Sequence, residues 1–561
     1  MSVVTATILS EGAKLDKPYE VLSIETDKRV NRVPRAVIEL RDGDVGKGEF
    51  ALSDAGTFEP GKQLEIKLRY EGEADETVFK GVVISHGIRA SSDGATLAVE
   101  LKDKAVKLTQ VRRSAVFRDQ TDSDVIKKLL QDGGVDVGTV DATRPQHAQL
   151  VQYYATDWDF ILSRADIQGL IVSADDGTVS ARKMEVAGRG KHTFRYGMDE
   201  VYAIDIKIDG QSQLSAVESV AWDIADQALT SAEQGQETSL AQGNLDGGQI
   251  ADAIGFDTYT LSQIAPLDSD ELEQWASARL ARSRLAMIRG AITVRGQADI
   301  KPLDIIDLDR VGQRFNGSAL VTGVRHSYDR HSWKTVLTVG LDPTWFSHED
   351  GIQESPAAGL LPGVTGLQVG IVDEFEDDPD EELRVKVIVP AIHADEGAVW
   401  ARLATPDAGD KRGYYFRPEK DDEVVVGFFN DDPRQAVILG AMFSSKNKRP
   451  EWVEDPDKKN LYKAIVTKQG TILGFSDDDK PSVFIETPDE NKILLSDDDK
   501  SIEITDQHGN SIKLTGDGVF IESVKDMKIS VDGELEIKAS SDITITSESK
   551  VEINAPQTDV M

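Results

Sequence analysis

Hydrophobic and polar residues alternate along most of this chain, which is the pattern of half-buried β-strands. In residues 64–70, Leu, Ile, Leu and Tyr alternate with Glu, Lys and Arg, and residues 96–101 repeat the pattern. Such segments place one face in a core and the other in water. The alternation predicts a mainly β protein.

Helical patterns are few, and the clearest is bounded by capping signals. It begins at Thr121-Asp122-Ser123-Asp124 and stops at Gly133-Gly134. A second helix is predicted from Asp157 to near Gly169, and a third from Ser269 to about Met287. Residues 230–256 are rich in Gly, Gln, Ser and Asp and are expected to form a long loop.

A compact β unit follows a predicted linker. Residues 357–366 contain Gly359, Pro362, Gly363 and Gly366, which favour an irregular connection. Four short strands are expected after it, at residues 383–389, 398–403, 423–429 and 436–439. Short strands separated by turn residues predict a small barrel or sandwich.

The C-terminal region carries an internal repeat of apolar pairs two residues apart. Five pairs recur every eight residues: Val519/Ile521, Met527/Ile529, Leu535/Ile537, Ile543/Ile545 and Val551/Ile553. Four earlier pairs lie at spacings of nine or ten: Val483/Ile485, Ile493/Leu495, Ile502/Ile504 and Ile512/Leu514. The two members of a pair lie on one face of a strand, and the residue between them points to the other face.

The eight-residue unit is too short to bury its own apolar face. Eight extended residues span at most about 26 Å at ~3.3 Å each, roughly one side of a coil. Three chains wound about one axis would supply three sides and bury every pair. The alternative is an ordinary β-meander with an accidental period. Five unbroken octads favour an intertwined trimeric β-helix, or β-prism.

The amino-acid composition argues against several classes of function and of site. The 561 residues carry a formal net charge of −36, which disfavours binding to nucleic acids and anionic lipids. The absence of cysteine excludes disulfides, thiol nucleophiles and all-Cys zinc sites. The N-terminus shows no secretory signal, and the longest apolar run, about residues 424–429, is too short for a membrane helix. We therefore expect synthesis in the cytoplasm without a signal peptide.

Three regions of the chain carry motifs that point to one known protein family. The compact β unit carries Arg384-Val385-Lys386-Val387, Trp400-Ala401-Arg402, Phe416-Arg417-Pro418, Asp422-Glu423-Val424 and Asp432-Pro433-Arg434. The N-terminal half carries Gln152-Tyr153, Asp157-Trp158-Asp159-Phe160-Ile161, Pro302-Leu303-Asp304 and Val321-Thr322-Gly323-Val324 with His326. Together with the C-terminal repeat, these motifs resemble the VgrG family of type VI and extracellular contractile injection systems, and the hub-plus-spike proteins of contractile phage tails. The C-terminal repeat resembles the needle of these spikes.

The resemblance implies a domain order along the chain. Two hub β-barrels with an α/β insertion are followed by an OB-fold and the trimeric β-helix. We expect hub barrel 1 at residues 1–105, the α/β insertion at 106–210, hub barrel 2 with helical and loop elements at 211–350, a linker at 351–366, the OB-fold collar at 367–447, a connector at 448–474 and the needle at 475–561.

The resemblance to the VgrG family also implies a structural role. A homotrimer would cap the six-fold inner tube as the central spike, and sheath contraction would drive it through the target envelope and export it. Implied partners are inner-tube and hub adaptor proteins, baseplate components, a PAAR-type tip protein and effector cargo. The target membrane would be contacted only mechanically. The alternative is a trimeric adhesin or tail-fibre-like binding module, for which an aromatic-rich globular tip after the prism would be expected.

No catalytic, cofactor-binding or metal-binding residue is predicted, and the chain is not expected to be an enzyme. His326 and His331 are expected near a strand end and not as metal ligands. The predicted site is the needle core on the trimer axis: Val519, Ile521, Met527, Ile529, Leu535, Ile537, Ile543, Ile545, Val551 and Ile553. Val551, Ile553 and Met561 are predicted to contact the tip partner.

Overall fold

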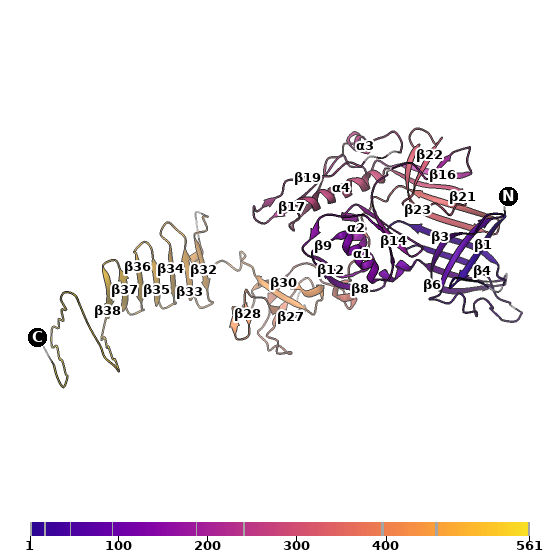
Figure 1. Cartoon of the computed structure of the whole chain (residues 1–561). Coiled ribbons are helices and arrows are strands. Elements are labelled where there is room, and N and C mark those ends of the chain that lie inside the picture. The colour runs from indigo at the N-terminus through magenta and orange to yellow at the C-terminus, as the bar shows by residue number, and fades with distance from the viewer. Residues whose placement is uncertain are drawn as a thin grey trace. The chain divides into compact units, whose positions relative to one another are not determined.

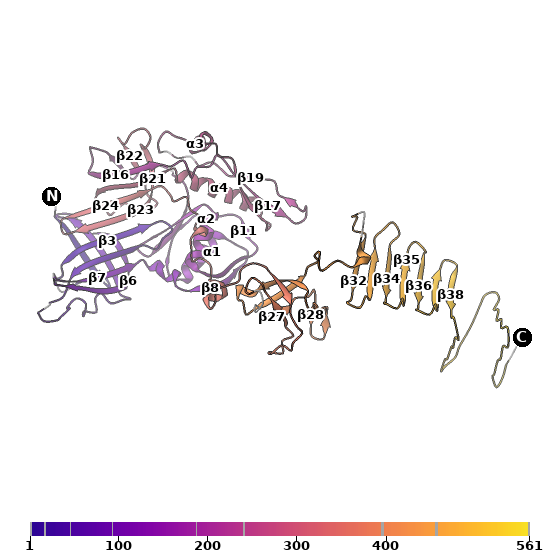
Figure 2. The ribbon, with the colours of Figure 1, turned by 180° about the vertical axis from the view of Figure 1, so that it is seen from behind.

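The computed structural model describes residues 3–558 apart from 16–17, 45, 93, 187, 239, 241, 394–397 and 455–457. Its contacts divide the chain into two units, residues 1–355 and 356–561. Strands dominate both units (Figures 1 and 2), which confirms the expected mainly β fold.

A 13-stranded sheet carries both predicted hub halves in the first unit. The halves join where β3 pairs antiparallel with β23, with Ile24 opposite Tyr328. Each half has its own core, around Ile66 and Phe79 in the first and around Ile292 and Leu337 in the second. The strands are β1 (Val4–Ser10), β2 (Ala13–Lys14), β3 (Val21–Arg29), β4 (Arg35–Arg41), β5 (Gln63–Tyr70), β6 (Glu76–Ser91), β7 (Gly94–Lys102), β15 (His192–Arg195), β16 (Val201–Ile208), β21 (Ile288–Arg295), β22 (Ile305–Asp309), β23 (Gly317–Asp329) and β24 (Ser332–Val339).

The α/β insertion contains the first two predicted helices, α1 (Asp122–Asp132) and α2 (Asp157–Ile167). Thr121 caps α1 as expected, because its hydroxyl accepts the Asp124 N–H at 3.2 Å and the Asp124 carboxylate accepts the Thr121 N–H. Around the helices lie η1 (Lys104–Thr109), β8 (Arg112–Phe117), β9 (Gln120–Thr121), β10 (Asp136–Val140), β11 (Gln146–His147), β12 (Leu150–Thr156), β13 (Leu170–Asp175) and β14 (Thr178–Lys183).

Two expectations for this unit were wrong in detail. The predicted boundary at residue 210 places β16 in the insertion, but β16 pairs with β21 and so belongs to the second hub half. The predicted loop at 230–256 contains helix α3 (Gly247–Ile254). Asp246 caps its start, and Gly255 ends it in the left-handed region at φ 90°, so this short helix depends on its caps and not on a long apolar stripe.

Helix α4 (Ser269–Leu285) agrees with the third predicted helix and packs on β17. It covers a small sheet made of β17 (Val217–Asp223), β18 (Ala228–Leu229), β19 (Glu233–Gln234) and β20 (Tyr259–Gln263). The short helix η2 (Phe346–His348) follows the main sheet.

The second unit begins with η3 (Pro356–Gly359) in the predicted linker and continues into a closed five-stranded barrel. Gly370 allows the barrel wall to close, because a Cβ there would lie 2.5 Å from Cγ1 of Val387 and 2.7 Å from Cγ2 of Val426. The barrel elements are β25 (Gln368–Val372), β26 (Val385–Ile388), β27 (Ala398–Leu403), β30 (Glu423–Phe428) and β31 (Ala436–Ala441). They confirm the four predicted strands. The smaller elements β28 (Ala408–Gly409), β29 (Arg412–Gly413) and η4 (Phe429–Asp431) belong to the same region.

After η5 (Glu451–Val453), seven strands form an antiparallel meander in which each strand pairs with the next. They are β32 (Tyr462–Val466), β33 (Ile472–Ser476), β34 (Ser482–Glu486), β35 (Lys492–Ser496), β36 (Ser501–Thr505), β37 (Ser511–Thr515) and β38 (Gly518–Glu522). The regular structure therefore begins at Tyr462, inside the predicted connector at 448–474.

The two histidines weighed as metal ligands, His326 and His331, lie in different surroundings. His326 is buried in β23, with its Nδ1 3.0 Å from the hydroxyl of Thr335, whereas His331 lies in the exposed turn before β24. Burial, with a smaller contribution from the charge of Lys28, lowers the pKa of His326 from 6.5 to about 3.

We expect this histidine to make the hub less stable in acid. Between pH 6.5 and about 3 the unfolded chain binds a proton that the folded chain does not, so stability falls as the pH falls. The contribution is at most about 1.4 kcal/mol per pH unit. Denaturant unfolding at several pH values should show a shallower acid loss for His326→Gln than for the original chain; equal slopes would contradict this origin.

Candidate assembly interface

One face of the β32–β38 meander is a continuous apolar surface made by the repeat pairs. The registers place Val483 opposite Leu495, Leu495 opposite Ile502, and so on across the sheet. The same alignment continues to the last strand, where Ile512 lies opposite Ile521 and Leu514 opposite Val519. Directly opposed apolar side chains stabilise neighbouring strands and form two parallel columns. Figure 2 shows these strands stacked in order.

Among the described residues of the single chain, nothing covers the apolar columns. Val519 is 66% exposed, and the flanking pairs from Ile485 to Leu514 are each more than a third exposed. The opposite face differs, because Phe484 is buried against Trp452 at a ring distance of 4.9 Å, and Glu503 and Lys513 form an ion pair further along. An apolar surface of this length marks an interaction site.

Asparagine side chains hold successive turns together along one edge of the meander. Asn491 accepts a hydrogen bond from the Gln507 N–H at 3.3 Å, and Asn510 accepts one from the Val524 N–H at 2.9 Å. The opposite edge carries the repeated acidic turns, where Lys480 forms an ion pair with Asp498. Within the described residues, no group of three or more acidic or histidine side chains is placed to hold a metal ion.

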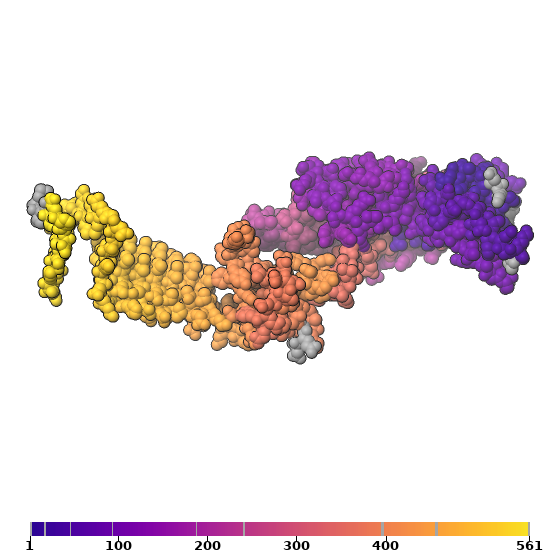
Figure 3. Space-filling model, turned by 90° about the horizontal axis from the view of Figure 1, so that it is seen from below, coloured from indigo at the N-terminus to yellow at the C-terminus, as the bar shows by residue number. Residues whose placement is uncertain are grey.

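The eight-residue repeats behave differently from the ten-residue repeats. Beyond β38, residues 523–558 contain no assigned strand, and the apolar pairs remain exposed, with Ile529 at 64% and Ile545 at 71%. In the space-filling view the yellow segment continues from the meander and its later part extends away from it (Figure 3), while its start is held by the hydrogen bond from the Val524 N–H to Asn510. The eight-residue spacing does not by itself prevent pairing, because β37 and β38 are joined by a turn of only two residues, Gly516 and Asp517.

The predicted needle-core residues thus fall into two groups. Val519 and Ile521 lie in β38 and continue the columns of the meander. The other eight lie in the unpaired segment, all more than half exposed. Of the predicted tip contacts, Val551 and Ile553 are exposed, and Met561 lies outside the described residues. The antiparallel meander of the earlier repeats is a feature that the sequence analysis did not separate from the octads.

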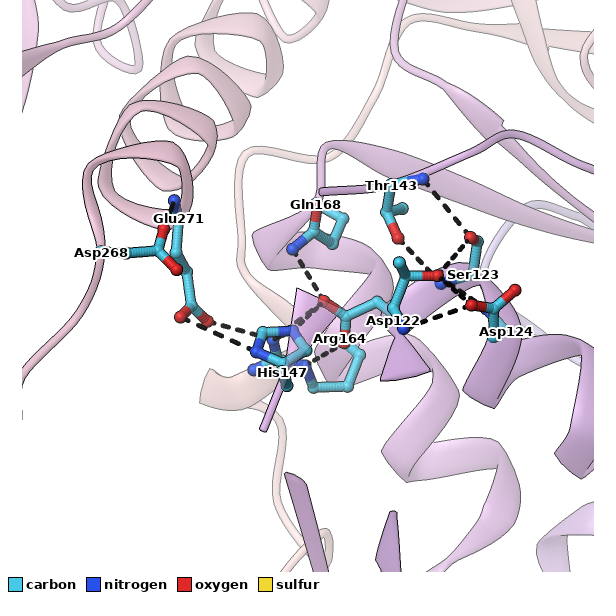
Figure 4. Close-up of polar contacts among 10 residues, drawn as sticks. Asp122, Ser123, Asp124, Thr143, His147, Arg164, Gln168, Asp268 and Glu271 are labelled. Atoms are coloured by element: carbon cyan, nitrogen blue, oxygen red, sulfur yellow. Dashed lines mark hydrogen bonds and ion pairs between the residues drawn. The ribbon is translucent and has the colours of Figure 1, made fainter. Parts of the chain in front are cut away.

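A buried ion network that the sequence did not reveal joins the insertion to the second hub half (Figure 4). At its centre is Asp122, whose side chain is fully buried at the first turn of α1. Its carboxylate accepts hydrogen bonds from Arg164 Nε at 2.5 Å, Gln168 Nε2 at 2.7 Å and His147 Nε2 at 2.9 Å. Arg164 also reaches Glu271 of α4 at 3.2 Å.

The network sets the charge of its members. Burial alone would raise the pKa of Asp122, but the hydrogen bonds from His147 and Arg164 outweigh burial and hold the pKa below its usual range. The hydrogen bond between His147 and Asp122 also raises the pKa of His147. The ionised carboxylate of Asp122 accepts hydrogen bonds from three donors. The network therefore holds together helices α1, α2 and α4, which come from distant parts of the sequence. Only the Thr121–Asp124 cap was visible from the sequence.

Three family models match this chain, and their descriptions indicate the class of protein to which it belongs. Residues 1–329 match the Alg8 N-terminal domain, residues 368–443 the type VI secretion system/phage-baseplate injector OB domain, and residues 482–560 the phage baseplate V C-terminal trimerisation domain. The chain belongs to the VgrG-like spike proteins and carries an Alg8 N-terminal domain. The resemblance seen in the sequence is confirmed, and the family gives this VgrG-like protein a structural role in a tail spike or baseplate.

Among curated proteins, the actin cross-linking toxin VgrG1 of Vibrio cholerae is 23% identical over 533 residues. The match covers 85% of this chain and 45% of the toxin, so this VgrG-like chain spans about half the length of that relative. No helix among the described residues is both long and apolar enough to cross a membrane.

Solved structures similar to this VgrG-like chain come from phage tails and type VI systems. The 43 kDa tail protein of prophage MuSo2 from Shewanella oneidensis is 14% identical, with a TM-score of 0.43 over 62% of this chain and 98% of its own. The E. coli c3393 protein, a component of the type VI secretion system, is 16% identical, with a TM-score of 0.40 over 78% and 99%. The Francisella PdpA–VgrG complex is 8% identical, with a TM-score of 0.41 over 93% and 88%.

Proposed function

We propose that three copies of this chain form the central spike of a contractile injection system and cap its six-fold inner tube. Sheath contraction would then drive the spike through the target envelope. The observation that carries the proposal is the exposed apolar surface of the meander and octads, which coincides with the region that matches a trimerisation domain. The adhesin alternative uses a similar prism, but the matches to the injector OB and baseplate domains favour the spike.

The energetics support assembly through this surface. Burying a Val, Ile or Leu side chain stabilises a structure by about 1.5–3 kcal/mol, so ten half-exposed octad residues supply on the order of 10 kcal/mol per chain. Interchain pairing would also give ladder partners to the octads at residues 527–553, in which the structure assigns no strand, and it would remove the open edge of β38. A dry axis and a continuous ladder would give a stiff rod suited to puncturing.

The charge distribution supports a rod that stays soluble and passes through an envelope without adhering. From Phe475 to Met561 the chain holds 21 acidic residues and 8 lysines. The needle-core positions contain none of these charges, so the acids would lie on the outside of the trimer. A strongly negative outer surface disfavours binding to anionic lipid.

We infer further partners by position. The exposed Val551 and Ile553 end the apolar columns and would contact a PAAR-type tip protein, while the first unit would contact the inner tube, hub adaptors and baseplate. Effector cargo would travel with the tip or tube. The mass of the purified chain in solution tests the trimer: three chains of 61.3 kDa give about 184 kDa.

A further inference from the structure

Two apolar patches remain exposed among the described residues of the first unit. The first is the outer face of the sheet that β8 forms with β12, where Val116 lies opposite Val151 and both side chains are about half exposed. Tyr153 lies beside them, at a break in the β8–β12 register, and is 76% exposed. We call these three residues the hairpin face. An apolar patch of this kind marks a site of interaction.

The second patch lies at the tip of the small sheet that α4 covers. Trp222 of β17 lies opposite Leu229 of β18, and both side chains are exposed. Ile224, in the turn between these strands, is also exposed, and Ile264, which follows β20, is 87% exposed. The parallel pairing of β17 with β20 brings the ends of these two strands together. We call these four residues the arm tip.

The two patches lie in segments of opposite charge. Residues 208–278, which contain the arm tip, include 13 acidic residues and no lysine, arginine or histidine. Residues 104–118, which end with β8 and the residue after it, include five basic residues and no acidic one. Arg118 is exposed at the end of β8, and Arg113 keeps about half of its side chain exposed at 3.7 Å from Asp157. The hairpin face is therefore bordered by positive charge, and the arm tip by negative charge.

We propose that the arm tip of one copy docks on the hairpin face of a second copy, and that this contact repeats around the hub of the trimer. A contact between two different surfaces is heterologous, and three such contacts close into a ring. An apolar centre with complementary charges at its rim is the composition of a specific interface.

The placement of the two surfaces is compatible with such a ring. Figures 1 and 2 show β17 and the β8–β12 sheet at the end of the first unit that lies away from the N-terminus. Rotation about an axis that runs along this unit keeps both surfaces at that end. The inference rests on the proposed trimer and adds to it the surfaces through which neighbouring hubs meet.

Cross-linking of the full-length chain tests this contact, because the chain contains no natural cysteine. Each chain carries Val116→Cys and Ile224→Cys and is treated with a bis-maleimide. We expect the product on a denaturing gel to shift from 61.3 kDa to about 184 kDa, three times 61.3 kDa, because each chain is linked to both neighbours. The pair Tyr153→Cys and Ile264→Cys should give the same shift.

Asp132→Cys with Ile224→Cys is the matched control, because Asp132 is also about half exposed in the insertion but lies on α1, outside the hairpin face. Its product should stay at 61.3 kDa. The solution mass before cross-linking separates this inference from the proposed function, because a mass near 61.3 kDa contradicts the trimer itself. A trimeric mass with no linked product from either pair, or with equal yields from the control, overturns the contact proposed here.

Discussion

Replacing Ile545 by aspartate is expected to destabilise the assembled needle severely. In the proposed trimer Ile545 faces the axis, so three carboxylates would meet at one level without water. Each unpaired buried charge costs several kcal/mol, and together they should lower the free energy of trimer dissociation by roughly 5 kcal/mol or more. With Ile537→Asp added, we expect the trimer not to form.

The neighbouring Thr544 provides the control. Thr544→Asp introduces the same side chain one residue earlier, at a position that faces outward in the prism. Its dissociation midpoint in urea, followed by sedimentation, should remain close to that of the original chain. If Ile545→Asp and Thr544→Asp shift the midpoint equally, Ile545 does not lie on the axis.

Removing the carboxylate of Asp122, at the centre of the buried ion network, should strongly destabilise helices α1 and α2. Asp122→Ala leaves the largely buried Arg164 and the amide of Gln168 without their main acceptor. Breaking a buried ion pair from one side costs about 3–5 kcal/mol. Hydrogen exchange in α1 and α2 should accelerate by roughly 100- to 4,000-fold, at about 1.4 kcal/mol per factor of ten.

Asp132→Ala is the matched control on the same helix. Asp132 pairs with Lys128 at 2.9 Å, but both side chains are about half exposed. Such a surface pair contributes about 0–1 kcal/mol, so exchange in α1 and α2 should change less than tenfold. Equal acceleration by the two substitutions would show that the Asp122 network does not hold these helices.

The elements that local signals specify were predicted well. The cap at Thr121 and the glycines at 133–134 mark the two ends of α1. The alternation of apolar and polar residues located the strands of the barrel. The short helix α3 was missed because Gly247 and Gly248 at its start lower helix propensity, although Asp246 and Gly255 mark its ends. The Gly-rich composition of residues 230–256 led to the prediction of a loop, although the two capping residues indicated a helix.

Long-range features could not be predicted in the same way. The contact of Asp122 with His147, Arg164 and Gln168, and through Arg164 with Glu271, depends on how separate helices pack, and no local spacing encodes it. The repeat showed which residues share a face. It did not show that the pairs up to Val519/Ile521 lie in strands that pair within one chain while the later octads contain no assigned strand.

The solution mass of the full-length chain at micromolar concentration tests the central claim most directly, with a truncation ending at Asn447 measured beside it. The truncation keeps the hub and barrel and removes the meander and octads. We expect about 184 kDa, three times 61.3 kDa, for the full chain and a smaller assembly for the truncation. A full-length mass near 61.3 kDa would contradict the trimer and, with it, the spike proposed here.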